Sequence, residues 1–240
     1  MPGLTKSSFI DIRFHGELCR LYADASLFLP DEQTLILSDL HLQKGFAQSK
    51  GAPLPGYDTQ DTLNRAEQAI RRNRPVRTIL LGDSFHTSEA AYSLPAAQRE
   101  HIARLGELTE LIWITGNHDP DLPADLPGRA LPQINALSVL CSHLPAFSAS
   151  EEHKLISPQI IGHYHPKAKL KLKARHLTSK CFIFDSQLLI MPAFGSFTGG
   201  LNVISHDIQR LLGPQQKAGF CFQDSIYLFP VTSAHFTTSV

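Results

Sequence analysis

Six short apolar runs divide the chain, and each is followed at once by a polar or glycine-rich turn. In chain order they are "TLILSD", "RTILLGD", "LIWITGN", "ALSVLCSH", "QIIGH" and "QLLIMPAFG". Continuous apolar runs of this length are typical of strands buried on both faces, as in a sheet that other layers cover. The chain is therefore predicted to form a layered structure with these strands in its interior.

The segments around these runs set the fold class. Residues 57–73 and 93–108 have helical patterns, and Asp58 or Thr59 is expected to cap the first helix. Residues 9–30 alternate as a hairpin would, and the second half of the chain is mostly strand-like. We expect an α/β sandwich with extra antiparallel strands, folded as one domain over residues 1–240.

Charge and cysteine content exclude some classes of protein. The formal net charge is zero, so no global charge indicates nucleic-acid or membrane binding. The four cysteines are scattered without a CxxC pair, which argues against a zinc knuckle or a dense disulfide framework. No apolar run reaches the roughly 18 to 20 residues of a membrane span, and no signal peptide opens the chain. We expect a cytoplasmic protein with reduced cysteines and no membrane partner.

Polar side chains that can bind metals follow five of the six runs. They are Asp39 and His41, Asp83 and His86, Asn117 with His118 and Asp119, His143, and finally His163 and His165. Any one of them alone is more often a turn residue or a cap. Ligands collect beyond the carboxyl ends of strands in open α/β sheets, so their repeated occurrence there predicts a shared site.

The chemistry of these side chains indicates the metal. Carboxylate, imidazole and amide groups without thiolate suit divalent manganese, iron, zinc or a mixture of them, whereas calcium or magnesium would be expected to use more oxygen ligands. With seven of these ten side chains as ligands, the number is too large for one ion and suits two ions about 3.5 to 4 Å apart, bridged by one carboxylate. If the chain is extended at "GHYH", His163 and His165 point the same way, and each is expected to serve a different ion.

The motifs "DLH", "GDSFH", "GNHD" and "GHYH", in this order and spacing, resemble those of the calcineurin-like metallophosphoesterase superfamily. The resemblance implies a four-layer α/β/β/α fold, a β-sandwich flanked by helices. It implies a first metal bound by Asp39, His41 and His165, a second bound by Asn117, His143 and His163, and Asp83 as the bridge. It also implies that His118 approaches the leaving group, oriented by Asp119. Many relatives have an aspartate at the position of His86. We expect His86 to contact the metal ligands instead of the metals themselves.

A narrower resemblance rests on "SDLHLQKG", "GAPLPGYDTQDTLNR" and "MPAFGSFTGG". These segments are similar to the DNA-ligase-associated (PdeM-like) metallophosphoesterases, and residues 1–34 and 201–240 remain unassigned. The resemblance implies manganese-dependent cleavage of DNA in repair, with a DNA ligase and a helicase of the same system as partners. The metal motifs lack the arginines with which protein phosphatases of the superfamily clamp a phosphomonoester, which favours a diester.

The segment "PKAKLKLKAR" alternates basic and apolar residues directly after His165. A strand over residues 167–175 would present a face of four lysines and Arg175, able to hold a phosphate backbone. The alternative is an edge strand protected from aggregation by lysines. A diesterase acting on small molecules or cyclic nucleotides, and an inactive interaction scaffold, remain the alternative functions.

Overall fold

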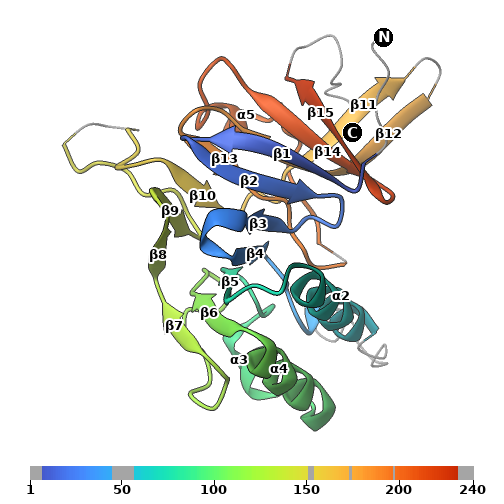
Figure 1. The fold of residues 1–240 in the computed structure, drawn as a ribbon, viewed down its shortest axis with the longest axis vertical. Helices are drawn as coiled ribbons and strands as arrows, with labels where there is room; N and C mark the ends of the chain where they lie inside the picture. The colour runs from blue at the N-terminus through green and yellow to red at the C-terminus, as the bar shows by residue number, and fades with distance from the viewer. Residues whose placement is uncertain (1–6, 45–56, 151–153, 173–174, 197, 232–240) are drawn as a thin grey trace.

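Two stacked sheets with helices on their outer faces make up the fold (Figure 1). The computed structural model describes residues 7–44, 57–150, 154–172, 175–196 and 198–231. The four-layer α/β/β/α fold expected from the sequence is confirmed. None of the helices in this described part is long and apolar enough to cross a membrane.

Within the described residues, the first sheet has seven strands that lie in chain order. They are β1 (Phe9–Phe14), β2 (Glu17–Tyr22), β3 (Leu27–Leu29), β4 (Thr34–Ser38), β5 (Arg77–Leu81), β6 (Glu110–Ile114) and β7 (Arg129–Leu131). Strands β4 to β7 pair in parallel, so the turns after them lie at one edge of the sheet.

The second sheet follows the order β15-β14-β12-β13-β10-β9-β8, and β11 pairs with β12 beside this path. Its strands are β8 (Gln133–Ala136), β9 (Val139–Ser142), β10 (Gln159–Ile161), β11 (Lys167–Leu172), β12 (Arg175–Phe184), β13 (Leu188–Ile190), β14 (Lys217–Phe222) and β15 (Ser225–Pro230). Strands β9, β10 and β13 are parallel to one another, and all six apolar runs of the sequence contain strands of the two sheets.

The described helices are η1 (Pro30–Glu32), α2 (Tyr57–Asn73), α3 (Ser88–Tyr92), α4 (Ala96–Leu108) and α5 (His206–Gln209). Helix α2 packs on the first sheet through Leu63, Ala66 and Ile70, which share one helical face. Asp58 and Thr59 lie in its first turn, so the predicted cap is wrong because the helix begins earlier.

Three apolar clusters hold the layers together. The first lies between the sheets, for example Ile36 and Ile79 against Ile160 and Phe182. The second joins the first sheet to α2 and α4, and the third joins the second sheet to α5. Both faces of the interior strands are therefore buried, as the continuous apolar runs predict.

The basic segment after His165 forms a hairpin instead of one strand. Strand β11 pairs antiparallel with β12, with Leu172 opposite Arg175. Ala168 and Leu170 are buried on one side, which confirms the alternation in the first part of the segment. The chain reverses before Arg175, so the prediction of one continuous basic face that includes it is wrong, and Lys173 lies outside the described residues.

Candidate metal centre

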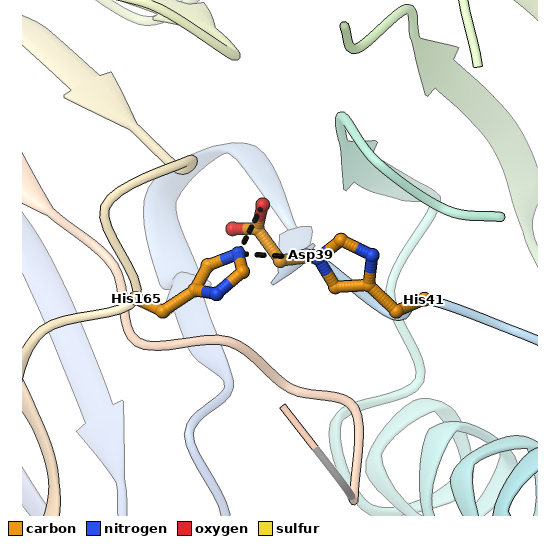
Figure 2. Close-up of side chains that lie close together, drawn as sticks. All are labelled: Asp39, His41 and His165. Carbon is orange, nitrogen blue, oxygen red and sulfur yellow. Dashed lines mark hydrogen bonds and ion pairs between the residues drawn. The ribbon is translucent and has the colours of Figure 1, made fainter. Parts of the chain in front are cut away.

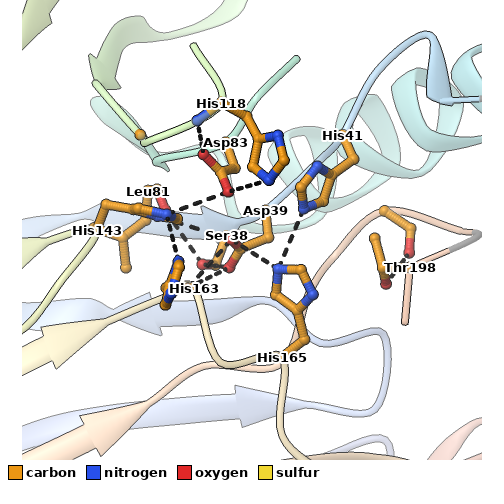
Figure 3. Close-up of polar contacts among 12 residues, drawn as sticks. Ser38, Asp39, His41, Leu81, Asp83, His118, His143, His163, His165 and Thr198 are labelled. Carbon is orange, nitrogen blue, oxygen red and sulfur yellow. Dashed lines mark hydrogen bonds and ion pairs between the residues drawn. The ribbon is translucent and has the colours of Figure 1, made fainter. Parts of the chain in front are cut away.

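The predicted metal-binding residues meet where strands of both sheets end (Figure 3). Asp39, Asp83 and Asn117 follow the first-sheet strands β4, β5 and β6. The second sheet contributes the histidines that follow β9 and β10. These are His143, His163 and His165. The site therefore lies across the joint between the two sheets.

One group consists of Asp39, His41 and His165 (Figure 2). The Nε2 atoms of the two histidines approach to 3.2 Å, and His165 Nε2 lies 3.0 Å from Asp39 Oδ1. The candidate ligand atoms of the group all lie within 4.8 Å of one another. This matches the first ligand set implied by the sequence motifs.

A second group consists of Asp83, His143 and His163. His143 Nε2 lies 3.3 Å from Asp83 Oδ2 and 3.2 Å from His163 Nδ1. Asn117 joins this group, because its Oδ1 is 2.9 Å from His143 Nε2. His163 and His165 thus belong to different groups, as expected.

The two groups touch each other through Asp39. The backbone N–H of His163 donates to both carboxylate oxygens of Asp39, at 3.2 and 3.1 Å. His143 Nδ1 lies 3.8 Å from Asp39 Oδ1. Ser38 also donates its hydroxyl to the Asp39 carboxylate, a contact that the sequence analysis missed although the serine directly precedes the aspartate.

Five of the candidate ligands have left-handed backbone conformations. The φ angles are 51° for Asp39, 46° for His41, 42° for Asp83, 67° for His163 and 45° for His165. The chain is therefore not extended at "GHYH", so the condition under which the two histidines would point the same way is not met. Such conformations cost energy in residues with a Cβ and are found at functional sites.

Glycines allow the close approach of the two sheets. Gly82 has a φ of +75°, and a Cβ built on it would lie 2.1 Å from His143 Nδ1. A side chain at this position would displace the imidazole from the Asp83 carboxylate. Gly82 is thus required both by its backbone conformation and by its contact with the site.

The protonation of the site favours cation binding. Burial alone would raise the pKa values of the two buried aspartates, but the hydrogen bond and charge of His165 lower that of Asp39, and those of His143 lower that of Asp83 to about 2. Burial lowers the pKa of His41 to about 3 and also lowers that of His163. His143 is the exception: burial alone would lower its pKa, but the hydrogen bond to Asp83 and the charges of Asp39 and Asp83 raise it. Because metals require charged carboxylates and neutral imidazoles, His143 would release a proton when a cation binds.

These donors fit a pair of divalent cations. In each group, ring nitrogens of two histidines face one another at 3.2 Å beside a carboxylate. Two neutral imidazoles cannot both direct lone pairs at one point without a proton or a cation between them. Nitrogen and carboxylate ligands without thiolate suit manganese, iron or zinc.

His118 and His86 lie beside the two groups. The His118 side chain is 44% exposed, and its Nε2 is 4.0 Å from Asp83 Oδ2. Its ring stacks on that of His86, with centroids 5.8 Å apart and an interplanar angle of 18°. Its backbone N–H donates to Asp83 Oδ1 at 2.9 Å, so the loop of His118 is tied to the second group.

Asp119 is fully buried and binds backbone amides. Its Oδ1 accepts from Gly116 N and its Oδ2 from Phe85 N, both at 3.0 Å. The carboxylate therefore ties the loop after β6 to the loop after β5. Asp119 was expected to orient His118, and the structure places its carboxylate on the backbone of the loop that carries His118.

Comparison with known proteins places the chain in a family. A family model described as calcineurin-like phosphoesterase matches residues 33–180. The crystal structure of Pseudomonas putida nuclease MPE is similar, with 22% sequence identity, a TM-score of 0.65, and coverage of 92% of this chain and 100% of that chain. YfcE, a phosphoesterase from E. coli, has 14% identity and a TM-score of 0.42, over 83% of this chain and 99% of that chain. A search of curated proteins finds no match. The chain belongs to the calcineurin-like phosphoesterase family, whose members are metal-dependent phosphoester hydrolases.

Proposed function

We propose that the protein is a two-metal phosphodiesterase that cleaves DNA, most effectively with manganese. The observation that carries the proposal is the pair of contiguous ligand groups, one with Asp39 and one with Asp83. Asp39, His41 and His165 would hold one cation, and Asn117, His143 and His163 the other. Asp83 would contact both cations, as the resemblance of the motifs implies, and its Oδ2 lies 3.3 Å from His143 Nε2 of the second group.

The bound cations would lower the pKa of the attacking water and offset the charge that develops on the phosphate. The residues of the chain set the geometry around them. Asp39 and Asp83 keep their negative charge because histidines lower their pKa values. His118 is exposed at the rim of the second group, where it would donate a proton to the leaving oxygen.

A phosphodiester is favoured over a monoester by the composition of the metal motifs. A monoester dianion is commonly clamped by arginine in a bidentate manner. The segments "GDSFHT" and "GNHD" contain no arginine. The histidines of these segments, His86 and His118, leave the rim of the site less cationic, which suits a substrate with one negative charge.

DNA as the substrate is supported by the start of the basic hairpin. Strand β11 begins two residues after His165, and Lys167 and Lys169 alternate with the buried Ala168 and Leu170. Lysines beside the site could neutralise successive phosphates of a polynucleotide. The similarity in fold to a protein described as a nuclease is compatible with this substrate.

We extend the proposal to the PdeM-like subfamily, and so to a role in DNA repair with a DNA ligase and a helicase as partners. The support is the resemblance of "SDLHLQKG" and "MPAFGSFTGG" to that subfamily. Co-purification of the protein with a ligase and a helicase from its own cells would test this part. Recovery of the protein without either partner would contradict it.

One observation favours a small-molecule diesterase as the second candidate. Lys167 Nζ donates to the backbone oxygen of Thr198 at 3.0 Å, which is a structural use of the lysine. If all hairpin lysines serve the fold in this way, DNA has no basic surface to follow. The two candidates then differ in whether the hairpin affects catalysis.

The experiment compares end-labelled single- and double-stranded DNA with bis-p-nitrophenyl phosphate, each with manganese. A variant in which Lys169 and Lys171 are changed to Gln should cleave DNA more slowly and with a weaker salt dependence, because fewer counterions are released. Its turnover of the small diester should remain near that of the wild type. Lys217→Gln, an exposed lysine on β14, is the matched control.

Cleavage of the small diester without cleavage of either DNA would reject the DNA proposal and support the second candidate. Absence of metal-dependent hydrolysis of any diester would support the inactive scaffold.

A further inference from the structure

Two basic side chains, Lys180 and Arg65, donate hydrogen bonds to one side of a loop, and the other side of this loop contacts the first ligand group. The loop follows β13 and contains Phe194 and Gly195. Lys180 Nζ on β12 donates to Gly195 O at 2.6 Å and to Phe194 O at 3.4 Å. Arg65 Nη1 on α2 donates to Phe194 O at 2.9 Å, and its guanidinium lies 4.5 Å above the Phe194 ring.

The front of the same loop is bonded to the turn that carries Asp39. Phe194 N donates to Ser38 O at 2.6 Å, and Gly195 N donates to Asp39 O at 3.2 Å. A Cβ on Gly195 would lie 2.2 Å from Leu40 O, so the two backbones are in close contact. The turn with its left-handed Asp39 is therefore supported from this side by the loop.

A single peptide unit connects the side chains of Lys180 and Arg65 to Asp39. The oxygen of Phe194 accepts from Arg65 and Lys180, while the N–H of the same peptide, that of Gly195, donates to Asp39 O. A cation on a peptide oxygen polarises the peptide and strengthens its N–H as a donor. The two basic side chains thus act on the Asp39 backbone through two hydrogen bonds in series.

We infer that Lys180 is a positioning residue for the first ligand group, and that it sets the affinity of this group for its cation. The inference rests on the proposed two-metal function. Lys180 does not contact the ligands, and acts by fixing the loop that holds the Ser38–Asp39 backbone. The second group, with Asp83 and His143, meets this chain of contacts only through the Asp39 carboxylate, which accepts from His163 N, so we expect the first group to be affected more strongly.

The surroundings of Lys180 fit a positioning role better than a role in solubility. Lys180 is partly buried, and burial lowers the pKa of its amine to about 7, so the side chain carries its positive charge below that pH. A buried amine needs acceptors in the protein, and the loop carbonyls supply them. A cavity of about 360 Å³ adjoins it, lined by residues that include Lys180, Arg65, Ser179 and Ser196.

The test measures manganese binding to the metal-free protein and steady-state turnover of bis-p-nitrophenyl phosphate, both at a pH just below 7, where the Lys180 amine is charged. Lys180→Met keeps the length of the side chain and removes the donor. We expect one of the two ions to bind about tenfold more weakly, as loss of hydrogen bonds from a charged donor implies. Lys217→Met should bind both ions like the wild type, because Lys217 is exposed at the far end of β14.

Chemical rescue separates positioning from packing. In Lys180→Ala, propylamine that enters the adjoining cavity should restore the affinity for the more weakly bound ion, because it replaces the three deleted carbons and the nitrogen. Propanol at the same concentration should restore this affinity much less, because its neutral hydroxyl is a weaker donor to the carbonyls. Equal restoration by propanol would assign the effect to volume alone and overturn the inference.

The other outcomes are also decisive. Two ions bound by Lys180→Met with wild-type affinities would overturn the positioning role while the two-metal function stands. Equal weakening of both ions, with a lowered melting temperature, would show a general loss of structure and also overturn it. A wild-type protein that binds no manganese would refute the proposed function itself.

Discussion

Removal of the metals should lower the melting temperature strongly, because the ligands come from both sheets. Asp39 and Asp83 follow strands of the first sheet, while His143, His163 and His165 follow strands of the second. These side chains are far apart in sequence and an unfolded chain does not bring them together, so the proposed cations would bind the folded form selectively. Chelation by EDTA therefore removes a linkage between the sheets.

The size of the effect follows from mass action. An ion present at 100 times its dissociation constant stabilises the folded form by about 2.7 kcal/mol. Two such ions contribute about 5 kcal/mol, and a chain of this size shifts by roughly 2 to 4 °C per kcal/mol, so the expected shift is on the order of 10 to 20 °C. The carboxylates left without cations remain paired with histidines, as Asp83 is with His143, so the apoprotein should still fold.

Differential scanning calorimetry with graded manganese concentrations provides the assay. The melting temperature should rise with the logarithm of the manganese concentration in the wild type. In His165→Ala, which removes one ligand of the first group, about half of the shift should remain. A melting temperature independent of manganese, or an undiminished shift in His165→Ala, would refute the reasoning.

Four further changes test individual residues. Asp83→Ala should abolish diester hydrolysis in a folded protein, and near-wild-type turnover would contradict the bridge. His118→Ala should keep two ions but slow DNA cleavage by about 10²-fold or more, because an alkoxide leaving group needs a proton; loss of one ion in metal analysis would instead make His118 a ligand. Asp119→Ala should destabilise the fold by roughly 2 to 4 kcal/mol, since it leaves two buried amides unpaired, and urea unfolding measures this; a change below 0.5 kcal/mol would argue against the backbone role. Burial lowers the pKa of Lys180 to about 7, so between this pH and about 10 the unfolded chain binds a proton that the folded chain lacks. Wild-type stability should therefore rise relative to Lys180→Met by up to about 1.4 kcal/mol per pH unit, whereas parallel curves from chemical denaturation at pH 7, 8 and 9 would place that pKa elsewhere.

Local sequence patterns predicted the strands and the residues of the site well. A run such as "RTILLGD" specifies a buried strand and places Asp83 at its carboxyl end, because both properties depend on neighbouring residues. Parallel pairing then brings Asp39, Asp83 and Asn117 to one edge. The structure places the seven candidate ligands together, while their role in binding metal remains a prediction.

Features that depend on distant contacts were not predictable from the pattern. The alternation of "KAKLKLKAR" does not reveal that the chain reverses before Arg175, because the same alternation is compatible with one continuous strand and with two paired strands. Asp119 could not be assigned to Phe85 N and Gly116 N without knowing that the two loops lie side by side. The contacts of Lys180 were not predictable because its acceptors, Phe194 O and Gly195 O, are backbone atoms 14 and 15 residues away.

The left-handed ligands have a consequence for protein engineering. Glycine adopts a positive φ more readily than a residue with a Cβ, by roughly 1 kcal/mol or more. Glycine at His41 would also remove a buried ring nitrogen, Nδ1, for which the described residues provide no hydrogen-bond partner. A directed-evolution screen for heat resistance, carried out in the presence of chelator, would therefore favour variants that have lost the catalytic centre. The same screen with manganese present would retain the ligands, because bound metal then contributes to the stability that is selected.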